Sequence, residues 1–161
     1  LHEEGRVLDA VVARNEAERA EMWARREAAA EVALTGRPFV NGDVALPLDA
    51  VGAFLDRAEA AVAALDPGAE ILPVAHLGDG NVHYPVLLSR SDPALKEAVT
   101  EAVEDIVQDL RGSFSAEHGI GLSKLGSMRR RKDPAALAAM RAIKAALDPA
   151  GIMNPGKVIP D

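Results

Sequence analysis

The stretch 71–88, ILPVAHLGDGNVHYPVLL, constrains the fold most, because two apolar runs flank the tetrapeptide GDGN. Asp-Gly between such runs predicts a β-hairpin closed by a type I′ turn. With Asp79 and Gly80 as the two turn residues, His76 is predicted to lie directly opposite His83 on one face of the sheet, with Cβ atoms roughly 5 Å apart. Two imidazoles at that separation can bind one metal ion.

The composition limits the class of protein. The chain of 161 residues is long enough for one domain that buries its own core, and we predict a single domain over 1–161. There is no cysteine, so a metal must be held by His, Asp or Glu. The net charge of −7 argues against nucleic acid or an anionic membrane as the main partner. No transmembrane segment or signal peptide is recognisable, and we expect a cytoplasmic protein.

The order of the expected elements predicts an α+β fold. Residues 3–34, rich in Ala, Glu and Arg, predict a long N-terminal helix. The pattern then predicts a strand at 39–46, a helix at 48–65, the hairpin, a helix at 93–110, a fourth strand at 113–116 and a C-terminal helix at 134–147. This is the ferredoxin-like split βαβ order, an antiparallel sheet with helices on one face and the other face open.

Three of the four histidines fall in two short motifs, His76-x6-His83 and Glu117-His118. Catalytic zinc usually takes three N or O ligands and keeps one position for water or substrate. His76, His83 and Glu117 form such a set if the fourth strand brings Glu117 beside the hairpin. Neighbours on a strand point to opposite faces, so His118 joins the site only if the chain turns, which the two following glycines allow. His118 is then a candidate general base.

Two alternatives stay open at this point. In the first, the histidines only hydrogen-bond across the hairpin, and the chain is a ferredoxin-like binding or interaction module whose open sheet face docks a partner. In the second, the same three ligands activate a water for metal-dependent hydrolysis. Asp79 is interpreted as a turn residue, because this turn type favours Asp for backbone reasons.

Taken together, HLGDGNVH at 76–83, SAEHGIG at 115–121, LDP at 147–149 and NPGK at 154–157 resemble the C-terminal domain of FAD-linked oxidases. Within the vanillyl-alcohol-oxidase superfamily, the chain is similar to the D-lactate, glycolate and D-2-hydroxyglutarate dehydrogenases. The resemblance implies a substrate- and metal-binding cap domain of an oxidoreductase that oxidises a D-2-hydroxy acid to a 2-oxo acid. It also implies that a separate N-terminal domain holds FAD, so we expect a fragment that is inactive alone.

The same resemblance implies roles for individual residues. His76, His83 and Glu117 match the ligands of a divalent metal, usually zinc, that holds the substrate's hydroxyl and carboxylate oxygens. His118 matches the base that takes the hydroxyl proton as hydride passes to the flavin.

Three further residues match the substrate and flavin side of such proteins. Arg26 matches an arginine that pairs with a substrate carboxylate, a geometry in which arginine forms two parallel hydrogen bonds. Asn81 lines the same pocket, and Asn154 belongs to a tail that runs toward the flavin domain. The chain has Ala30 and Asn41 where hydroxyglutarate enzymes carry threonine and lysine, so lactate, glycolate or a larger 2-hydroxy acid is at least as consistent as a dicarboxylate. A homodimer is the remaining expected partner.

Overall fold

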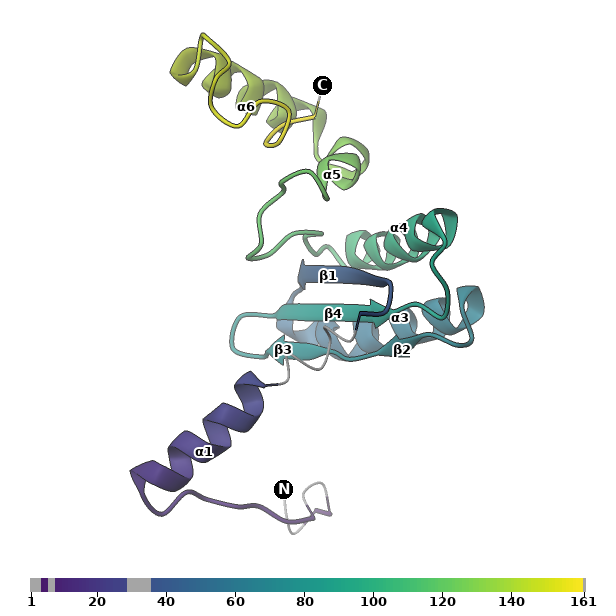
Figure 1. The fold of residues 1–161 in the computed structure, drawn as a ribbon, viewed down its shortest axis with the longest axis vertical. Helices are drawn as coiled ribbons and strands as arrows, with labels where there is room; N and C mark the ends of the chain where they lie inside the picture. The colour runs from purple at the N-terminus through teal and green to yellow at the C-terminus, as the bar shows by residue number, and fades with distance from the viewer. Residues whose placement is uncertain (1–3, 6–7, 29–35, 161) are drawn as a thin grey trace. The chain divides into compact units, whose positions relative to one another are not determined.

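The computed structural model describes residues 4–5, 8–28 and 36–160 (Figure 1). The chain divides into two compact units, Leu1–Gly36 and Arg37–Asp161. The prediction of a single domain over the whole chain stays a prediction.

In the first unit, helix α1 spans Glu16–Glu27. The predicted helix over 3–34 is therefore wrong at its start, because residues 8–13 are not helical, while residues 29–35 lie outside the described part. Asn15 explains the late start: its side chain accepts a hydrogen bond of 2.9 Å from the Glu18 N–H, which a continuous helix would direct to Arg14. Asparagine at this position is a strong N-cap, so helix begins after it despite the propensity of the residues before.

The second unit contains an antiparallel sheet of four strands: β1 (Phe39–Ala45), β2 (Glu70–Ile71), β3 (Val74–His76) and β4 (Asn81–Leu87). Strand β4 lies in the centre, with β1 along one side and β2 and β3 along the other. Pro73 lies between β2 and β3, where a residue without an N–H interrupts the ladder. The predicted fourth strand at 113–116 is reduced to one isolated bridge between Ser113 and Ala45. The α+β prediction is confirmed, and its ferredoxin-like detail stays a prediction.

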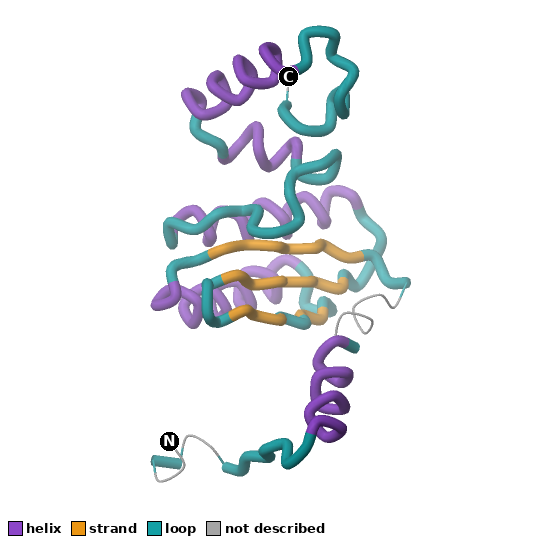
Figure 2. Tube along the Cα trace, turned by 90° about the vertical axis from the view of Figure 1, so that its left-hand side faces the viewer, coloured by secondary structure: helices purple, strands orange, loops and turns teal. Residues whose placement is uncertain are grey.

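Two helices cover one face of this sheet, as Figures 1 and 2 show. Helix α3 (Val51–Leu65) follows a short 3-10 turn, η1 (Leu48–Ala50), and α4 (Pro93–Asp109) begins after Asp92, whose side chain accepts from the Ala94 N–H at 2.9 Å. The core between the helices and the sheet is built from alternate residues of the strands and one side of each helix. Its buried members include Val44, Phe54, Val62, Val82, Tyr84, Val86, Val99 and Val107.

The hairpin has a different register from the predicted one. His76 lies opposite Asn81, and His83 lies opposite Val74, so the predicted direct opposition of the two histidines is wrong. Residues 77–80 form a four-residue loop in which the N–H groups of Asp79 and Gly80 both donate to the His76 carbonyl. Positive φ occurs at Gly80 but not at Asp79, which excludes a type I′ turn. The observed register differs from the predicted one by two residues, an even number, so both histidines still lie on the same sheet face.

The second unit also contains helices α5 (Leu125–Arg131) and α6 (Pro134–Leu147), so the helix predicted at 134–147 is confirmed. Helix α5 is held against α4 by ion pairs: Arg131 lies 2.6 Å from Asp105 and 3.4 Å from Glu104, and Arg130 lies 2.6 Å from Glu97. In the described part of the chain, no helix has the length and apolar character needed to cross a bilayer.

Candidate metal and substrate site

The side chains of His76, His83 and Glu117 converge on the sheet face that α3 and α4 leave open. The Nε2 atoms of His76 and His83 are 3.2 Å apart. One oxygen of Glu117 lies 3.7 Å from His76 Nε2, and the other lies 3.8 Å from His83 Nε2. The three residues predicted as a ligand set are thus brought together, although one of them comes from a segment more than 30 residues away along the chain.

Glu117 reaches the hairpin on a loop rather than on the predicted strand. The bridge between Ser113 and Ala45 starts this loop beside β1, and the Ala116 N–H donates to the Asp43 carbonyl at 3.1 Å. Gly119 and Gly121 both have positive φ, of 69° and 53°, so the chain turns directly after His118. The turn allows adjacent residues to serve one site.

Asn81 fixes the carboxylate of Glu117. Its side-chain amide donates to Glu117 Oε1, and the asparagine itself is buried. The backbone N–H of Asn81 donates to the Asp79 side chain at 3.1 Å, which supports the interpretation of Asp79 as a loop residue. The Oδ1 atom of Asn81 is buried and accepts no hydrogen bond from the described residues.

His118 lies beside the three converging side chains. Its ring stacks on the ring of His83, with centroids 5.1 Å apart and planes 11° from parallel. Its side chain is 44% exposed, and its Nδ1 lies 3.8 Å from Asp43 Oδ2. A histidine that is held on one side and open to solvent on the other can exchange a proton with a bound molecule.

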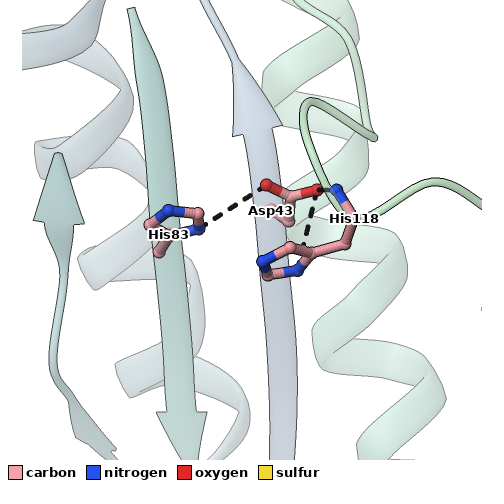
Figure 3. Close-up of side chains that lie close together, drawn as sticks. All are labelled: Asp43, His83 and His118. Carbon is pink, nitrogen blue, oxygen red and sulfur yellow. Dashed lines mark hydrogen bonds and ion pairs between the residues drawn. The ribbon is translucent and has the colours of Figure 1, made fainter. Parts of the chain in front are cut away.

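Asp43 is fully buried, and its carboxylate faces the rings of both His83 and His118 (Figure 3). Its carboxylate accepts from the backbone N–H groups of Ala116, Glu117 and His118, and from the Lys124 ammonium at 3.1 Å. Burial raises the pKa of Asp43, but the hydrogen bond from His118 and the hydrogen bond and charge of Lys124 outweigh it. The net pKa is lowered, so the group is an anion at neutral pH.

Asp43 and Lys124 were not predicted as residues of the site. One signal was available: Asp43 interrupts the apolar pattern of its strand, FVNGDVAL, and a carboxylate in a buried strand needs partners. No local pattern indicated Lys124, because it meets Asp43 from 81 residues further along the chain.

Arg26 and Asn154 belong to other segments of the chain. Arg26 belongs to the first unit, where its guanidinium lies 5.6 Å from the centre of the Trp23 ring. Asn154 has a φ of 48° in the C-terminal tail, and its carbonyl accepts from the Lys157 N–H at 3.2 Å. Their predicted contacts with substrate and flavin stay predictions. Asn41 is exposed on β1, and Ala30 lies outside the described residues.

The donor set fits a divalent metal ion. Ligand atoms about 2.1 Å from a tetrahedral zinc are about 3.4 Å from each other. The two Nε2 atoms are 3.2 Å apart, each lies 3.7 or 3.8 Å from one of the two Glu117 oxygens, and one ligand atom from each of the three residues lies within 4.8 Å of the others. Two imidazoles and one carboxylate are also a common set in zinc enzymes. Asp43, His83 and His118 form a second group of side chains whose ligand atoms lie close enough together to hold a metal ion, and this group shares His83 with the first.

Comparison with known proteins identifies the family. Residues 1–158 match the model for the C-terminal domain of FAD-linked oxidases. The chain is 37% identical to a D-2-hydroxyglutarate dehydrogenase of Stutzerimonas stutzeri and 36% identical to one of Xanthomonas citri, in each case over 97% of this chain and 34% of the relative. It is 36% identical to the mitochondrial D-2-hydroxyglutarate dehydrogenase of Bos taurus, over 97% of this chain and 28% of the relative. The chain spans about a third of the length of these relatives, and it belongs to the family of FAD-linked oxidases, as their C-terminal domain.

Proposed function

We propose that this chain is the substrate- and metal-binding domain of an FAD-dependent dehydrogenase that oxidises a D-2-hydroxy acid to the 2-oxo acid. The observation that carries the proposal is the convergence of His76, His83 and Glu117, with His118 stacked beside them, in a member of this oxidase family. The alternative of a binding module with structural histidines does not explain why Glu117 is held toward both rings. FAD, bound mainly by another part of the protein, supplies the hydride acceptor.

In this proposal, His76, His83 and Glu117 hold a divalent metal, for which zinc is the first candidate. A bound divalent cation acts as a Lewis acid toward the hydroxyl and carboxylate oxygens of a 2-hydroxy acid. Asn81 keeps Glu117 in place through its side-chain amide. The nitrogen and oxygen donors also suit manganese, so the metal is to be identified by elemental analysis.

His118 is proposed to accept the proton of the substrate hydroxyl. Its ring is fixed by stacking on His83, and its backbone N–H is anchored to Asp43 at 2.9 Å. The exposed part of the ring leaves access for a substrate. A neutral imidazole is suited to this step near neutral pH.

The proposed substrate class is D-2-hydroxy acids as a whole. The relatives named above are D-2-hydroxyglutarate dehydrogenases, and Arg26 is proposed to pair with a substrate carboxylate as a guanidinium pairs with carboxylates elsewhere. Asn41 carries no charge, so a second carboxylate has no cation at that position of β1. D-lactate, glycolate and D-2-hydroxyglutarate therefore belong in one substrate panel.

The test uses the intact protein that contains this chain. We expect bound FAD, one equivalent of metal, and reduction of the flavin by the D but not the L enantiomer of a 2-hydroxy acid. His83→Ala should lose both metal and turnover, whereas His118→Asn should lose turnover and keep the metal. If His83→Ala kept full turnover after treatment with a chelator, the proposed metal site would be wrong.

Two further proposals concern the setting of the protein. We propose that it works in the cytoplasm, although the Bos taurus relative is named as mitochondrial. We also propose a homodimer as the form to test. Fractionation of the source cells checks the first proposal, and light scattering on the intact protein checks the second.

A further inference from the structure

Asp43 is buried in a way that requires an explanation. It is fully buried, and it lies on the sheet face that carries the histidines, opposite His83 in the pairing of β1 with β4. A buried carboxylate is costly unless charged or hydrogen-bonded partners compensate it. The partners of Asp43 come from the loop that carries Glu117 and His118, so the carboxylate joins the loop to the sheet.

The contacts with the loop involve mainly one oxygen. Oδ2 of Asp43 accepts from the backbone N–H of Glu117 at 3.1 Å and from that of His118 at 2.9 Å. The Lys124 ammonium bonds to the same oxygen at 3.1 Å and to the Ser115 hydroxyl oxygen at 2.9 Å. These bonds fix the backbone of two adjacent site residues, and therefore the direction in which both side chains leave the loop.

The other oxygen faces His83. Oδ1 of Asp43 lies 3.5 Å from Nδ1 of His83, which is a facing contact rather than a formed hydrogen bond (Figure 3). This Nδ1 is buried and has no hydrogen-bond partner among the described residues. The opposite ring nitrogen, Nε2, faces His76 and Glu117. The two nitrogens of one ring thus face two different parts of the site.

A carboxylate beside Nδ1 selects the tautomer of a histidine. The anion favours the proton on Nδ1, which leaves the lone pair on Nε2 for a metal, and ligating histidines in metal proteins commonly have such a partner. We infer that Asp43 is a positioning residue of the proposed metal site: it orients His83 toward the metal through Nδ1 and holds the Glu117-His118 loop through Oδ2. The inference rests on the proposed function, because it assigns His83 Nε2 as a ligand atom.

The test is Asp43→Asn in the intact protein, with zinc affinity measured by competition with a chromophoric chelator. An asparagine amide that faces Nδ1 donates a hydrogen bond, which moves the ring proton to Nε2, where it blocks the lone pair. Loss of such a partner typically lowers metal affinity by about 10- to 100-fold, and we expect a fall in that range. A cobalt-substituted sample should show a changed visible absorption band, because the His83 ring no longer holds its orientation.

Asp66→Asn is the matched control. Asp66 is also a buried aspartate of this unit, and it accepts from the backbone N–H groups of Ser89 at 2.8 Å and Gly68 at 3.3 Å. It is not among the residues that converge on the candidate site. Asp66→Asn should therefore lower thermal stability and leave zinc affinity within twofold of the parent, which separates positioning from general loss of structure.

A second measurement does not depend on metal. The ¹⁵N chemical shifts of the His83 ring, recorded without metal at pH 8, should show the proton on Nδ1 in the parent and on Nε2 in Asp43→Asn. A parent protein that binds no zinc contradicts the proposed function. The ring shifts then still show whether Asp43 directs the proton of the His83 ring to Nδ1. The inference is overturned if the parent carries the proton on Nε2, or if Asp43→Asn binds zinc as tightly as the parent.

Discussion

The loop that joins β3 to β4 offers a sharp test, because its two glycines differ completely in their surroundings. A Cβ added at Gly80 would lie 2.0 Å from the carbonyl oxygen of Leu46, and Gly80 has a φ of 79°, in the left-handed region. A Cβ added at Gly78 would meet nothing within 4 Å, and Gly78 has no positive φ. Gly80→Ala and Gly78→Ala therefore form a matched pair, two residues apart in one loop.

The expected cost of Gly80→Ala has three parts. Left-handed backbone costs a residue with a Cβ roughly 1–2 kcal/mol. The backbone must shift away from Leu46, and forced repacking of this kind costs about 1–3 kcal/mol. The shift also strains the hydrogen bond of 2.9 Å between the Leu46 N–H and the Gly80 carbonyl, which contributes about 1 kcal/mol. We expect a total of about 3–6 kcal/mol for Gly80→Ala, against less than about 1 kcal/mol for Gly78→Ala.

Urea unfolding of the two variants and the parent, followed by circular dichroism, measures this difference. Gly80→Ala should also retain less metal, because Asn81 follows it directly and both histidines lie on the strands that the loop joins. If the free energies of unfolding of the two variants agreed within 1 kcal/mol, the close approach of Gly80 to Leu46 would be wrong.

Three further predictions concern groups away from the candidate site. The buried hydroxyl of Tyr84 has no hydrogen-bond partner among the described residues, and burial raises its pKa to about 12. Tyr84→Phe should therefore leave the free energy of unfolding in urea unchanged or raise it by about 1 kcal/mol. A decrease of about 1 kcal/mol in this free energy would contradict the prediction. Hydrogen bonding from Lys144 and from backbone N–H groups lowers the pKa of Asp148 to about 2. The ionised form therefore stabilises the fold above pH 4, and this contribution disappears between pH 4 and pH 2, so Asp148→Asn should be less stable than the parent at pH 7 and equal to it near pH 2 in thermal melts. Arg131→Met leaves the buried Glu104 with fewer partners and should cost about 2–3 kcal/mol in urea unfolding, with zinc affinity unchanged.

Local patterns predicted most of the elements of the second unit. The apolar spacing located α3 and α4, and the alanine-rich run located α6; in the structure, Asp92 and Asp133 cap α4 and α6. The same approach failed for α1, where high helix propensity suggested a start at residue 3 and the Asn15 cap decided otherwise. A single hydrogen bond to a capping side chain was enough to override the propensity of a whole segment.

The sequence predicted that His76, His83 and Glu117 come together, but not the geometry by which they do so. His76 and His83 were expected on one sheet face, and they are, but through a four-residue loop and a diagonal relation rather than a two-residue turn. Glu117 was expected on a fourth strand, and it arrives on a loop that Asp43 anchors. Asp43 was missed because its importance depends on partners more than 70 residues away.

By itself, the sequence determined the kinds of donor atoms that the chain offers, the face of the hairpin on which the histidines lie, and the positions where α4 and α6 begin. These features follow from local rules: the period of two along a strand, the capping preferences and the glycines at turns. Only the tertiary structure decided that Asp43 Oδ1 faces His83 Nδ1 and that Oδ2 accepts from the His118 N–H. The 115–124 segment meets β1 and the hairpin through contacts that no local pattern encodes. Buried charge needs its partners in space rather than in sequence, and for Asp43 those partners exist only after the chain has folded.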